Sequence, residues 1–260
     1  MIEISKKITT NVGRTNAQFG LIKENDRIMI GFSGGKDSLT LLHTLNRMQK
    51  KAPFKFDFKA VTITYGMGEQ IEFLSNHCKE HGIEHEIIDT QIFDLAGEKI
   101  RKNSSFCSFF SRMRRGYLYT TALEQGYNKV ALGHHLDDAM ESYFMNLFYN
   151  GTMRTMPPIY KASNGLEVIR PLIFCRERQL RAFADSNEIR VIGDEACPGL
   201  RFDVKMPHAR ATTKELLAKL EEQNPKIFVS MKAAFSNIQL PTFFYNNLKD
   251  INLNIEDENI

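Results

Sequence analysis

Short apolar runs and amphipathic stretches alternate along the first 150 residues of the chain. The apolar runs are typical of buried strands, and they span residues 27–32, 56–64, 84–89 and 129–133. The amphipathic stretches place apolar residues at helical spacing, and they span residues 1–23, 37–50, 69–81, 104–125 and 138–149. Strands that alternate with helices of about 10–15 residues predict βαβ units, and therefore a parallel sheet with helices on both faces.

The alternation weakens after Pro157 and Pro158. One more strand–helix–strand unit is predicted beyond them, over residues 167–172, 179–187 and 190–192. Two further helices are predicted by apolar spacing, over residues 212–222 and 226–236. The chain is thus expected to comprise an N-terminal helix (1–24), a doubly wound, Rossmann-like α/β domain (25–195), a helical C-terminal segment (196–245) and a flexible acidic tail (246–260).

The composition is that of a globular chain that folds without cross-links. Its 260 residues are 42% apolar and 25% charged, and such a length buries a core without disulfides or a metal. The four cysteines include no C-x-x-C pair, which excludes the commonest zinc and thioredoxin signatures. No apolar run follows the N-terminal lysines, and no stretch approaches a membrane helix. We therefore expect a cytoplasmic protein without a membrane partner.

The first predicted strand is followed by the sequence S-G-G-K-D-S at residues 33–38, which leads into a predicted helix. A doubly wound sheet binds its ligand at this edge, where glycines, a helix N-terminus and Lys36 favour an anion. The spacing is not that of a Walker A loop, because three residues separate Gly31 from Gly35 and Asp37 follows the lysine. The alternative is a tight turn with Asp37 as a helix cap, but a turn requires neither the two serines nor the lysine.

A second polar loop, G-H-H-L-D-D at residues 133–138, joins the fourth predicted strand to a helix. Both loops should open at the same edge of the sheet. We do not expect protein-bound zinc, because adjacent histidines point to opposite faces of an extended chain and H-E-x-x-H spacing is missing. Mg²⁺ takes one or two carboxylates together with phosphate oxygens, which fits Asp137 or Asp138. The alternative is a set of polar residues that cap a helix.

A basic region surrounds Cys107. Between residues 95 and 130, seven basic residues face two acidic ones, a net charge of +5 in a chain whose total is +3. Such a patch indicates a polyanionic partner, and a solvated helix face is the alternative. A second basic run follows, at Arg170, Arg176, Arg178 and Arg181. Nearby arginines favour the reactive thiolate form of a cysteine, although Cys107 taken alone is more simply a buried structural residue.

The loop at 33–38 resembles the S-G-G-x-D-S pyrophosphate loop of the PP-loop ATPases, and residues 133–138 resemble their G-H-H-x-D-D segment. C-S-x-x-S-R-x-R-R-G from Cys107, F-Y-N-G-T-M-R-T-M-P-P over 148–158, I-R-P-L from Ile169 and C-R-E from Cys175 extend the likeness. Over about residues 1–240 the chain is thereby similar to the tRNA 2-thiocytidine synthetase group. The resemblance implies an adenine nucleotide alpha hydrolase-like fold and an enzyme that forms AMP and pyrophosphate. It adenylates C2 of a tRNA cytidine and replaces the oxygen with sulfur.

The resemblance also implies roles for particular residues. The ATP site comprises Ser33, Gly34, Gly35, Lys36, Asp37, Ser38, Ala60, Thr62, Arg115, Gly133 and His135. The catalytic residues are Lys36, Asp37, Cys107, Asp138 and Cys197, and Asp37 and Asp138 also hold Mg²⁺. The residues that contact tRNA are Arg112, Arg114, Arg170, Arg176 and Arg178. The expected partners are tRNA, a sulfur donor protein or persulfide carrier, and a second copy of the chain in a homodimer.

Two departures from the family concern sulfur. Phe110 replaces the second cysteine of the family's C-x-x-C, and Asp194 replaces the first cysteine of a later pair. The family's iron–sulfur cluster uses three cysteines, whereas here an intact [4Fe–4S] cluster would need Cys107, Cys197 and Asp194. We therefore expect ATP and Mg²⁺ without an intact cluster. Cys107 and Cys197 could instead act as persulfide carrier and resolving thiol, or another nucleophile such as an amine could be used.

Two alternatives to a tRNA substrate stay open at this point. One is an amidating or synthetase enzyme that acts on a small molecule with the same ATP site. The other is a non-catalytic, ATP-binding regulatory domain, which would keep the loop at 33–38 but would not need Cys107.

Overall fold

The computed structural model describes residues 2–99, 106–193 and 208–242. Its centre is a six-stranded sheet in the order β3-β2-β1-β4-β6-β5. The strands are β1 (Arg27–Gly31), β2 (Asp57–Ile63), β3 (His85–Ile88), β4 (Lys129–Ala131), β5 (Ile159–Lys161) and β6 (Glu167–Ile169). All neighbouring strands run parallel except β5 and β6, which form an antiparallel pair at one edge. The predicted α/β class with a doubly wound, parallel sheet is confirmed.

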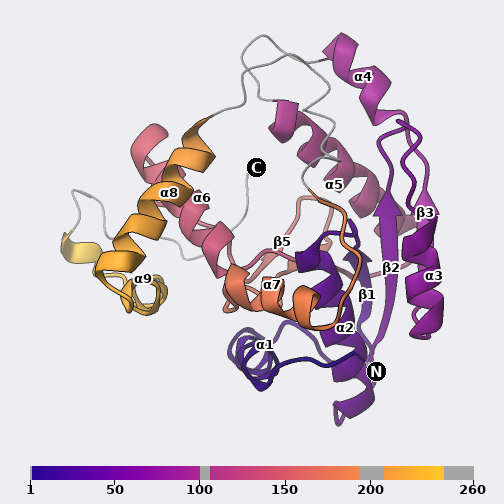
Figure 1. Ribbon diagram of the computed structural model, residues 1–260, viewed down its shortest axis with the longest axis horizontal. Coiled ribbons are helices and arrows are strands. Elements are labelled where there is room, and N and C mark those ends of the chain that lie inside the picture. Colours follow the sequence, from indigo (N-terminus) through magenta and orange to yellow (C-terminus); the bar gives the residue numbers. More distant parts are fainter. Residues whose placement is uncertain (1, 100–105, 194–207, 243–260) are drawn as a thin grey trace.

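Helices surround this sheet (Figure 1). They are α1 (Lys6–Phe19), α2 (Lys36–Lys51), α3 (Glu72–Glu80), α4 (Ile92–Lys99), α5 (Phe106–Glu124), α6 (Leu136–Tyr149), α7 (Glu177–Ser186), α8 (His208–Gln223) and α9 (Ile227–Ala234). A 3-10 turn follows at Leu240–Thr242. None of the helices in the described ranges is both long and apolar enough to cross a membrane.

The side chains of each strand point alternately to the two faces of the sheet, and the interior therefore has two large hydrophobic cores. Ile28 and Ile30 of β1 belong to the core that packs against α1, α2, α3 and α7, whereas Met29 belongs to the core against α4 and α5. Successive side chains of a strand point to opposite faces, so a strand buried on both faces is apolar throughout. The continuous apolar runs of the sequence therefore reflect the two-sided cover of the sheet.

A small third core joins the C-terminal helices to α6. Leu136 and Met140 of α6 pack with Leu217 of α8 and Phe228 of α9. Figure 1 shows α8 and α9 beside α6, away from the strands. The helical C-terminal segment is therefore attached through the helix that follows the G-H-H-L-D-D loop. The domain boundaries proposed from the sequence remain predictions.

One local expectation is wrong, and two elements were missed. Residues 190–192 form no strand, and Ile192 instead lies on the glycine loop, where its N–H donates to the Gly34 carbonyl at 2.9 Å. Helix α4 and strand β5 were not predicted. Strand β5 has three residues and is held in the sheet by its pairing with β6. The spacing of apolar residues along the chain does not reveal such a pairing.

Candidate active site

The site lies where the strand order reverses. The chain runs from β1 outward to β2 and β3, then returns to the other side of β1 with β4 and β6. In open α/β sheets the ligand crevice lies at this switch point, beyond the carboxyl ends of the strands. A cavity of about 410 Å³ opens there between the two motif loops. Of the residues expected to bind ATP, Ser33, Asp37, Ser38, Arg115 and Gly133 line it.

The glycine loop has the shape of an anion cradle. Gly34 has a φ of +78°, a conformation that favours glycine. The Ser38 hydroxyl accepts from the Ser33 N–H at 3.2 Å and donates to the Gly35 carbonyl at 3.0 Å, which fixes the turn. Gly35 is the N-cap of α2, and no side chain in the described ranges caps that helix start. The first N–H groups of α2 are thus available to a phosphate.

Lys36 connects the glycine loop to α7, and Gly133 allows close contact between the two loops. The Lys36 ammonium lies 3.2 Å from Glu177 of α7 and 3.4 Å from Asp37. Burial alone would raise the pKa of Glu177, but Lys214 and Lys36 lower it to about 2. A Cβ on Gly133 would lie 3.1 Å from the backbone of Asp37 and Ser38, so glycine allows the two loops to touch.

His135 and Asp138 form a reciprocal cap at the start of α6. The Asp138 carboxylate accepts from the His135 N–H at 3.0 Å, and His135 Nδ1 accepts from the Asp138 N–H at 3.4 Å. The other ring nitrogen, Nε2, lies 3.4 Å from Asp138 Oδ2 and 3.8 Å from Asp37 Oδ1. The capping box therefore aims the Asp138 carboxylate towards Asp37.

The carboxylates of Asp37 and Asp138 form only part of the ligand set that a metal ion requires. Asp37 Oδ1 is buried and has no hydrogen-bond partner among the residues that the structure describes. Burial raises the pKa of Asp37, and the charge of Asp138 adds to this effect, although His135 and Lys36 oppose it. Burial would also raise the pKa of Asp138, but His135, His134 and Arg210 lower it. An unpaired carboxylate oxygen beside a second carboxylate fits a hard cation such as Mg²⁺.

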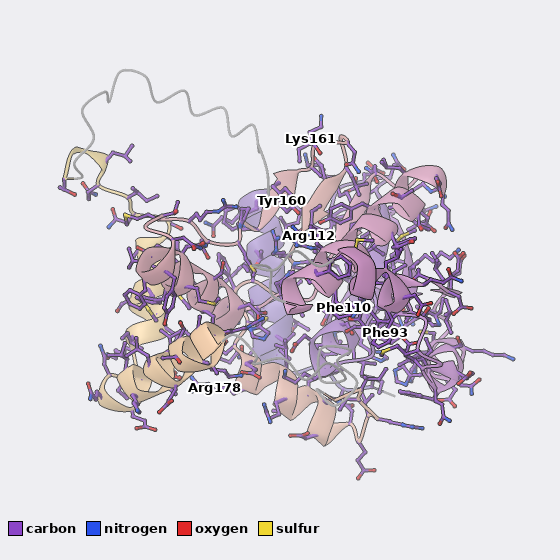
Figure 2. All side chains as sticks on the ribbon, turned by 90° about the horizontal axis from the view of Figure 1, so that it is seen from above. Phe93, Phe110, Arg112, Tyr160, Lys161 and Arg178 are labelled. Atoms are coloured by element: carbon purple, nitrogen blue, oxygen red, sulfur yellow. The ribbon has the colours of Figure 1, made fainter. Side chains whose placement is uncertain are left out.

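Aromatic and basic side chains form the opposite wall of the cavity. Arg114 Nη1 donates to the Tyr65 hydroxyl at 2.8 Å, and its guanidinium lies 5.0 Å from the Tyr65 ring centre. The Tyr65 ring meets Phe110 edge-on at 5.6 Å, and Figure 2 shows Phe110 near Phe93, whose ring it stacks against. Arg210 of α8 reaches in from the C-terminal segment and binds Asp138 at 2.6 Å.

Several polar residues of this cavity were not predicted as site residues, among them Tyr65, His134 and Arg210. Tyr65 lies two residues after the end of β2 and directly after the strand predicted over residues 56–64, so its place at the carboxyl end of that strand was a usable signal. His134 lies in the G-H-H-L-D-D loop; burial lowers its pKa to about 4, and Arg170 adds to the shift. Arg210 carries no local signal, because its partner Asp138 lies 72 positions earlier in the chain.

Other predicted residues lie outside the cavity. Val61 and Ile63 line it, so their neighbours Ala60 and Thr62 project from the other face of β2. Thr62 Oγ1 donates to the Phe32 carbonyl at 2.7 Å. The role in ATP binding that was expected of Ala60 and Thr62 remains a prediction.

The predicted tRNA arginines fall into two groups. Arg170 is 3% exposed, and it donates to His134 at 3.3 Å and to the Pro157 carbonyl at 2.6 Å. Arg176 pairs with Asp137 and Glu221, so the guanidinium groups of both residues are occupied by internal partners. Arg112 and Arg178 are exposed on α5 and α7 and are labelled in Figure 2.

The cysteines with described side chains are not candidates for chemistry. Cys78 and Cys175 are fully buried, and burial raises the pKa of each thiol to about 12. Cys107 belongs to α5, but its side chain, Cys197 and Asp194 lie outside the described residues. Phe110, at the family's second cysteine position, is 2% exposed and packs in the core beneath the cavity.

An uncapped helix start beneath a glycine loop, opposed by two half-buried carboxylates at the switch point, defines a nucleotide site of the pyrophosphate-binding type. The chain belongs to the PP-loop domain family, whose model matches residues 4–205. It is 44% identical to a tRNA-cytidine(32) 2-sulfurtransferase of Geobacter metallireducens, over 90% of each chain. A tRNA-cytidine(32) 2-sulfurtransferase of Pseudomonas syringae is 37% identical, over 98% of this chain and 92% of its own. The resemblance to the tRNA 2-thiocytidine synthetase group is confirmed.

Solved structures show the same fold. U34-tRNA thiolase NcsA from Methanococcus maripaludis, solved with its [4Fe-4S] cluster, has a TM-score of 0.70 at 23% identity, over 89% of this chain and 77% of its own. An NH3-dependent NAD synthetase from Campylobacter jejuni has a TM-score of 0.51 at 16% identity, over 90% of this chain and 87% of its own. At these identities the likeness concerns the fold alone.

Proposed function

We propose that this chain is an ATP-dependent tRNA sulfurtransferase that converts cytidine 32 of tRNA to 2-thiocytidine. The curated relatives support tRNA as the substrate and disfavour the small-molecule and regulatory alternatives. The observation that carries the chemistry is the convergence of the uncapped α2 start and the unpaired Asp37 oxygen on one cavity. In the first step, O2 of the base attacks the α-phosphorus of ATP and pyrophosphate leaves.

The loop residues would stabilise the departing pyrophosphate. Backbone N–H groups at the start of α2 would donate to its oxygens, and Lys36 would exchange its contact with Glu177 for one with phosphate. Asp37 and Asp138 would hold Mg²⁺, which would neutralise charge on the phosphates. The exposed guanidinium of Arg112, together with Arg114 and Arg115 at the cavity, would contact the RNA.

Sulfur delivery is proposed to use cysteines without an iron–sulfur cluster. Cys78 and Cys175 are buried, and the Phe110 side chain cannot bind iron. The chain therefore offers two thiolates, Cys107 and Cys197, whereas the family resemblance implies three for an iron–sulfur cluster. A donor protein would charge Cys107 as a persulfide, whose outer sulfur attacks C2 while AMP leaves with the original oxygen. Cys197 would then attack Cys107 Sγ and release the 2-thiocytidine, and a thiol reductant would reduce the resulting disulfide. The sulfur donor and the homodimer remain predictions.

The test is thiolation of unmodified tRNA with ATP, Mg²⁺ and a persulfide donor, followed by mass spectrometry of the nucleosides. Wild-type protein is expected to form 2-thiocytidine. Cys107→Ser is expected to release pyrophosphate without forming the thiolated base, and to release AMP only as water hydrolyses the adenylated base. Lys219→Gln is the matched control, because Lys219 is exposed on α8 outside the cavity. AMP formation that does not depend on tRNA would contradict the proposal, as would full thiolation by Cys107→Ser.

A further inference from the structure

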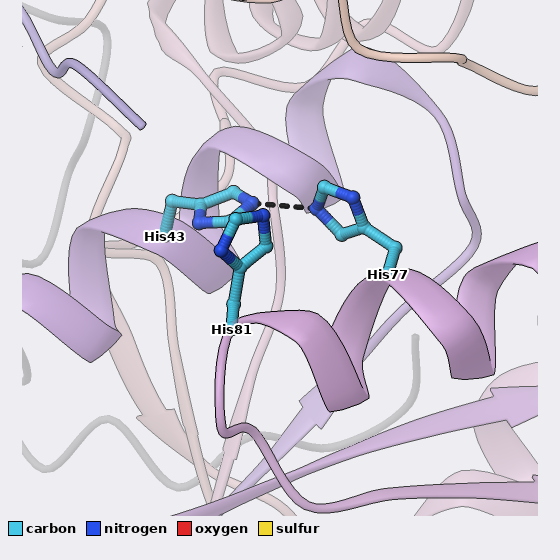
Figure 3. Close-up of side chains that lie close together, drawn as sticks. All are labelled: His43, His77 and His81. Atoms are coloured by element: carbon cyan, nitrogen blue, oxygen red, sulfur yellow. Dashed lines mark hydrogen bonds between the residues drawn. The ribbon is translucent and has the colours of Figure 1, made fainter. Parts of the chain in front are cut away.

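Three histidines meet between α2 and α3, outside the cavity described above. His43 comes from α2, His77 from α3, and His81 is the residue directly after α3 (Figure 3). Their ligand nitrogen atoms all lie within 4.8 Å of one another. His43 Nε2 and His77 Nε2 are 2.7 Å apart, and the His81 ring centre lies 4.9 Å from that of His43 and 4.7 Å from that of His77. The three rings therefore surround one point.

The environment favours the neutral imidazole, the form that binds metals, at His43 and His77. His43 is 4% exposed; burial lowers its pKa to about 3, and the charges of His77, His81 and Lys50 add to this shift. Burial also lowers the pKa of His77, although Glu80 opposes the effect. A metal requires a neutral imidazole, so little free energy would be spent on deprotonation at neutral pH.

We propose that His43, His77 and His81 form a binding site for a divalent transition-metal ion of the zinc class. Zn–N bonds of about 2.0–2.1 Å at a tetrahedral ion place neighbouring nitrogens about 3.3 Å apart. The nitrogens of His43 and His77 would thus move apart by a few tenths of an ångström from their present 2.7 Å. Three protein ligands leave one position for water, and imidazole suits Zn²⁺, Cu²⁺ and Ni²⁺ rather than Mg²⁺.

The ion would join two helices that support the glycine loop. Helix α2 begins at Lys36 in that loop. From α3, the Leu74 side chain lies next to Gly34, where a Cβ would be 3.0 Å from Leu74 Cδ2. A metal that bridges α2 and α3 would therefore hold the loop against its support without contact with the reacting atoms. This role is independent of the thiolation proposed above.

The experiment uses untagged full-length protein stripped of metal with a chelator and titrated with Zn²⁺ or Co²⁺. Cys107→Ser/Cys197→Ser serves as the background, so that thiolates cannot supply the site. In this background we expect one equivalent of Zn²⁺ to bind, with an increase in melting midpoint of about 5–10 °C at a hundredfold excess over Kd. The Co²⁺ form should show visible ligand-field bands without a thiolate charge-transfer band.

Two variants in this background decide the assignment. His77→Gln/His81→Gln should lose the equivalent of metal and the rise in melting midpoint, while His85→Gln should keep both, because His85 bonds to Thr62 and Ser75 outside the cluster. If the double variant does not fold, His81→Gln alone should weaken Zn²⁺ binding at least tenfold. Equal Zn²⁺ binding by the cluster variants and the background would overturn the proposal, as would no binding by the background.

Discussion

Replacing Arg176 with glutamine tests whether this residue is part of the scaffold or of the tRNA surface. Arg176 Nη1 and Nη2 bind the two Glu221 oxygens at 2.7 and 2.8 Å, and Nε binds Asp137 at 3.1 Å. Its guanidinium also lies 3.4 Å from the ring centre of Phe228. One side chain thus connects α6, α7, α8 and α9. Arg176→Gln should destabilise the fold.

The magnitude follows from burial. Removing one partner of a fully buried ion pair costs about 3–5 kcal/mol, because the remaining charge loses its compensation. Here the side chains of Arg176, Asp137 and Glu221 are 13%, 14% and 22% exposed, so solvent reduces the cost. Asp137 also keeps its bond from the Glu177 N–H at 2.8 Å. We expect a loss of about 2–3 kcal/mol, which lowers the melting midpoint by about 4–12 °C in a chain of this size.

The assay pairs thermal unfolding with tRNA binding at several salt concentrations. Arg178→Gln is the matched control for stability, because Arg178 is 65% exposed and lies 3.4 Å from the same carboxylate, Glu221. The control should melt within about 1 °C of wild type, since exposed ion pairs contribute little. Arg176→Gln should leave the salt dependence of binding unchanged. A variant that melts like wild type but has a smaller salt slope would refute the scaffold role.

Four further changes probe the site. Gly133→Ala should lower the rate of pyrophosphate release about tenfold to a hundredfold, because the new methyl group meets the backbone of Asp37 and Ser38 at 3.1 Å. Asp37→Asn should lower Mg²⁺-dependent turnover at least about a hundredfold at unchanged melting midpoint, and full activity would exclude its role. Arg112→Gln should reduce the salt slope of tRNA binding by about 1, which filter binding measures. Burial lowers the pKa of His85 to about 4, so between about pH 6.5 and pH 4 the unfolded chain binds a proton at His85 that the folded chain does not. Between pH 7 and pH 5 wild type should therefore lose about 1–2 kcal/mol more stability than His85→Gln, which thermal unfolding at the two pH values measures.

Sequence patterns identified the two loops because their chemistry is local. The apolar run of β1, the two glycines and the start of α2 are neighbours in the chain, so strand, turn and helix could be predicted together. The parallel sheet then placed the G-H-H-L-D-D loop at the same edge. The meeting of Asp37 and Asp138 at one edge of the sheet follows from this topology. That Asp37 Oδ1 has no hydrogen-bond partner among the described residues could be seen only in the structure.

Contacts between distant residues could not be predicted in this way. Arg176 was interpreted as part of a basic surface, because Asp137 and Glu221 lie 39 and 45 positions away. For the same reason the histidine cluster was missed, since 34 residues separate His43 from His77. Net charge along a segment does not indicate whether an arginine meets an internal carboxylate or the solvent.

The central claim is that the oxygen of a tRNA base passes to the α-phosphate of ATP in this site. The most direct measurement uses tRNA with ¹⁸O at C2 of cytidine 32, incubated with wild-type protein, ATP, Mg²⁺ and the sulfur donor. We expect one ¹⁸O atom in AMP for each 2-thiocytidine formed, and no labelled AMP with Asp37→Asn. Thiolated tRNA together with unlabelled AMP, or AMP that takes its oxygen from water, would contradict it.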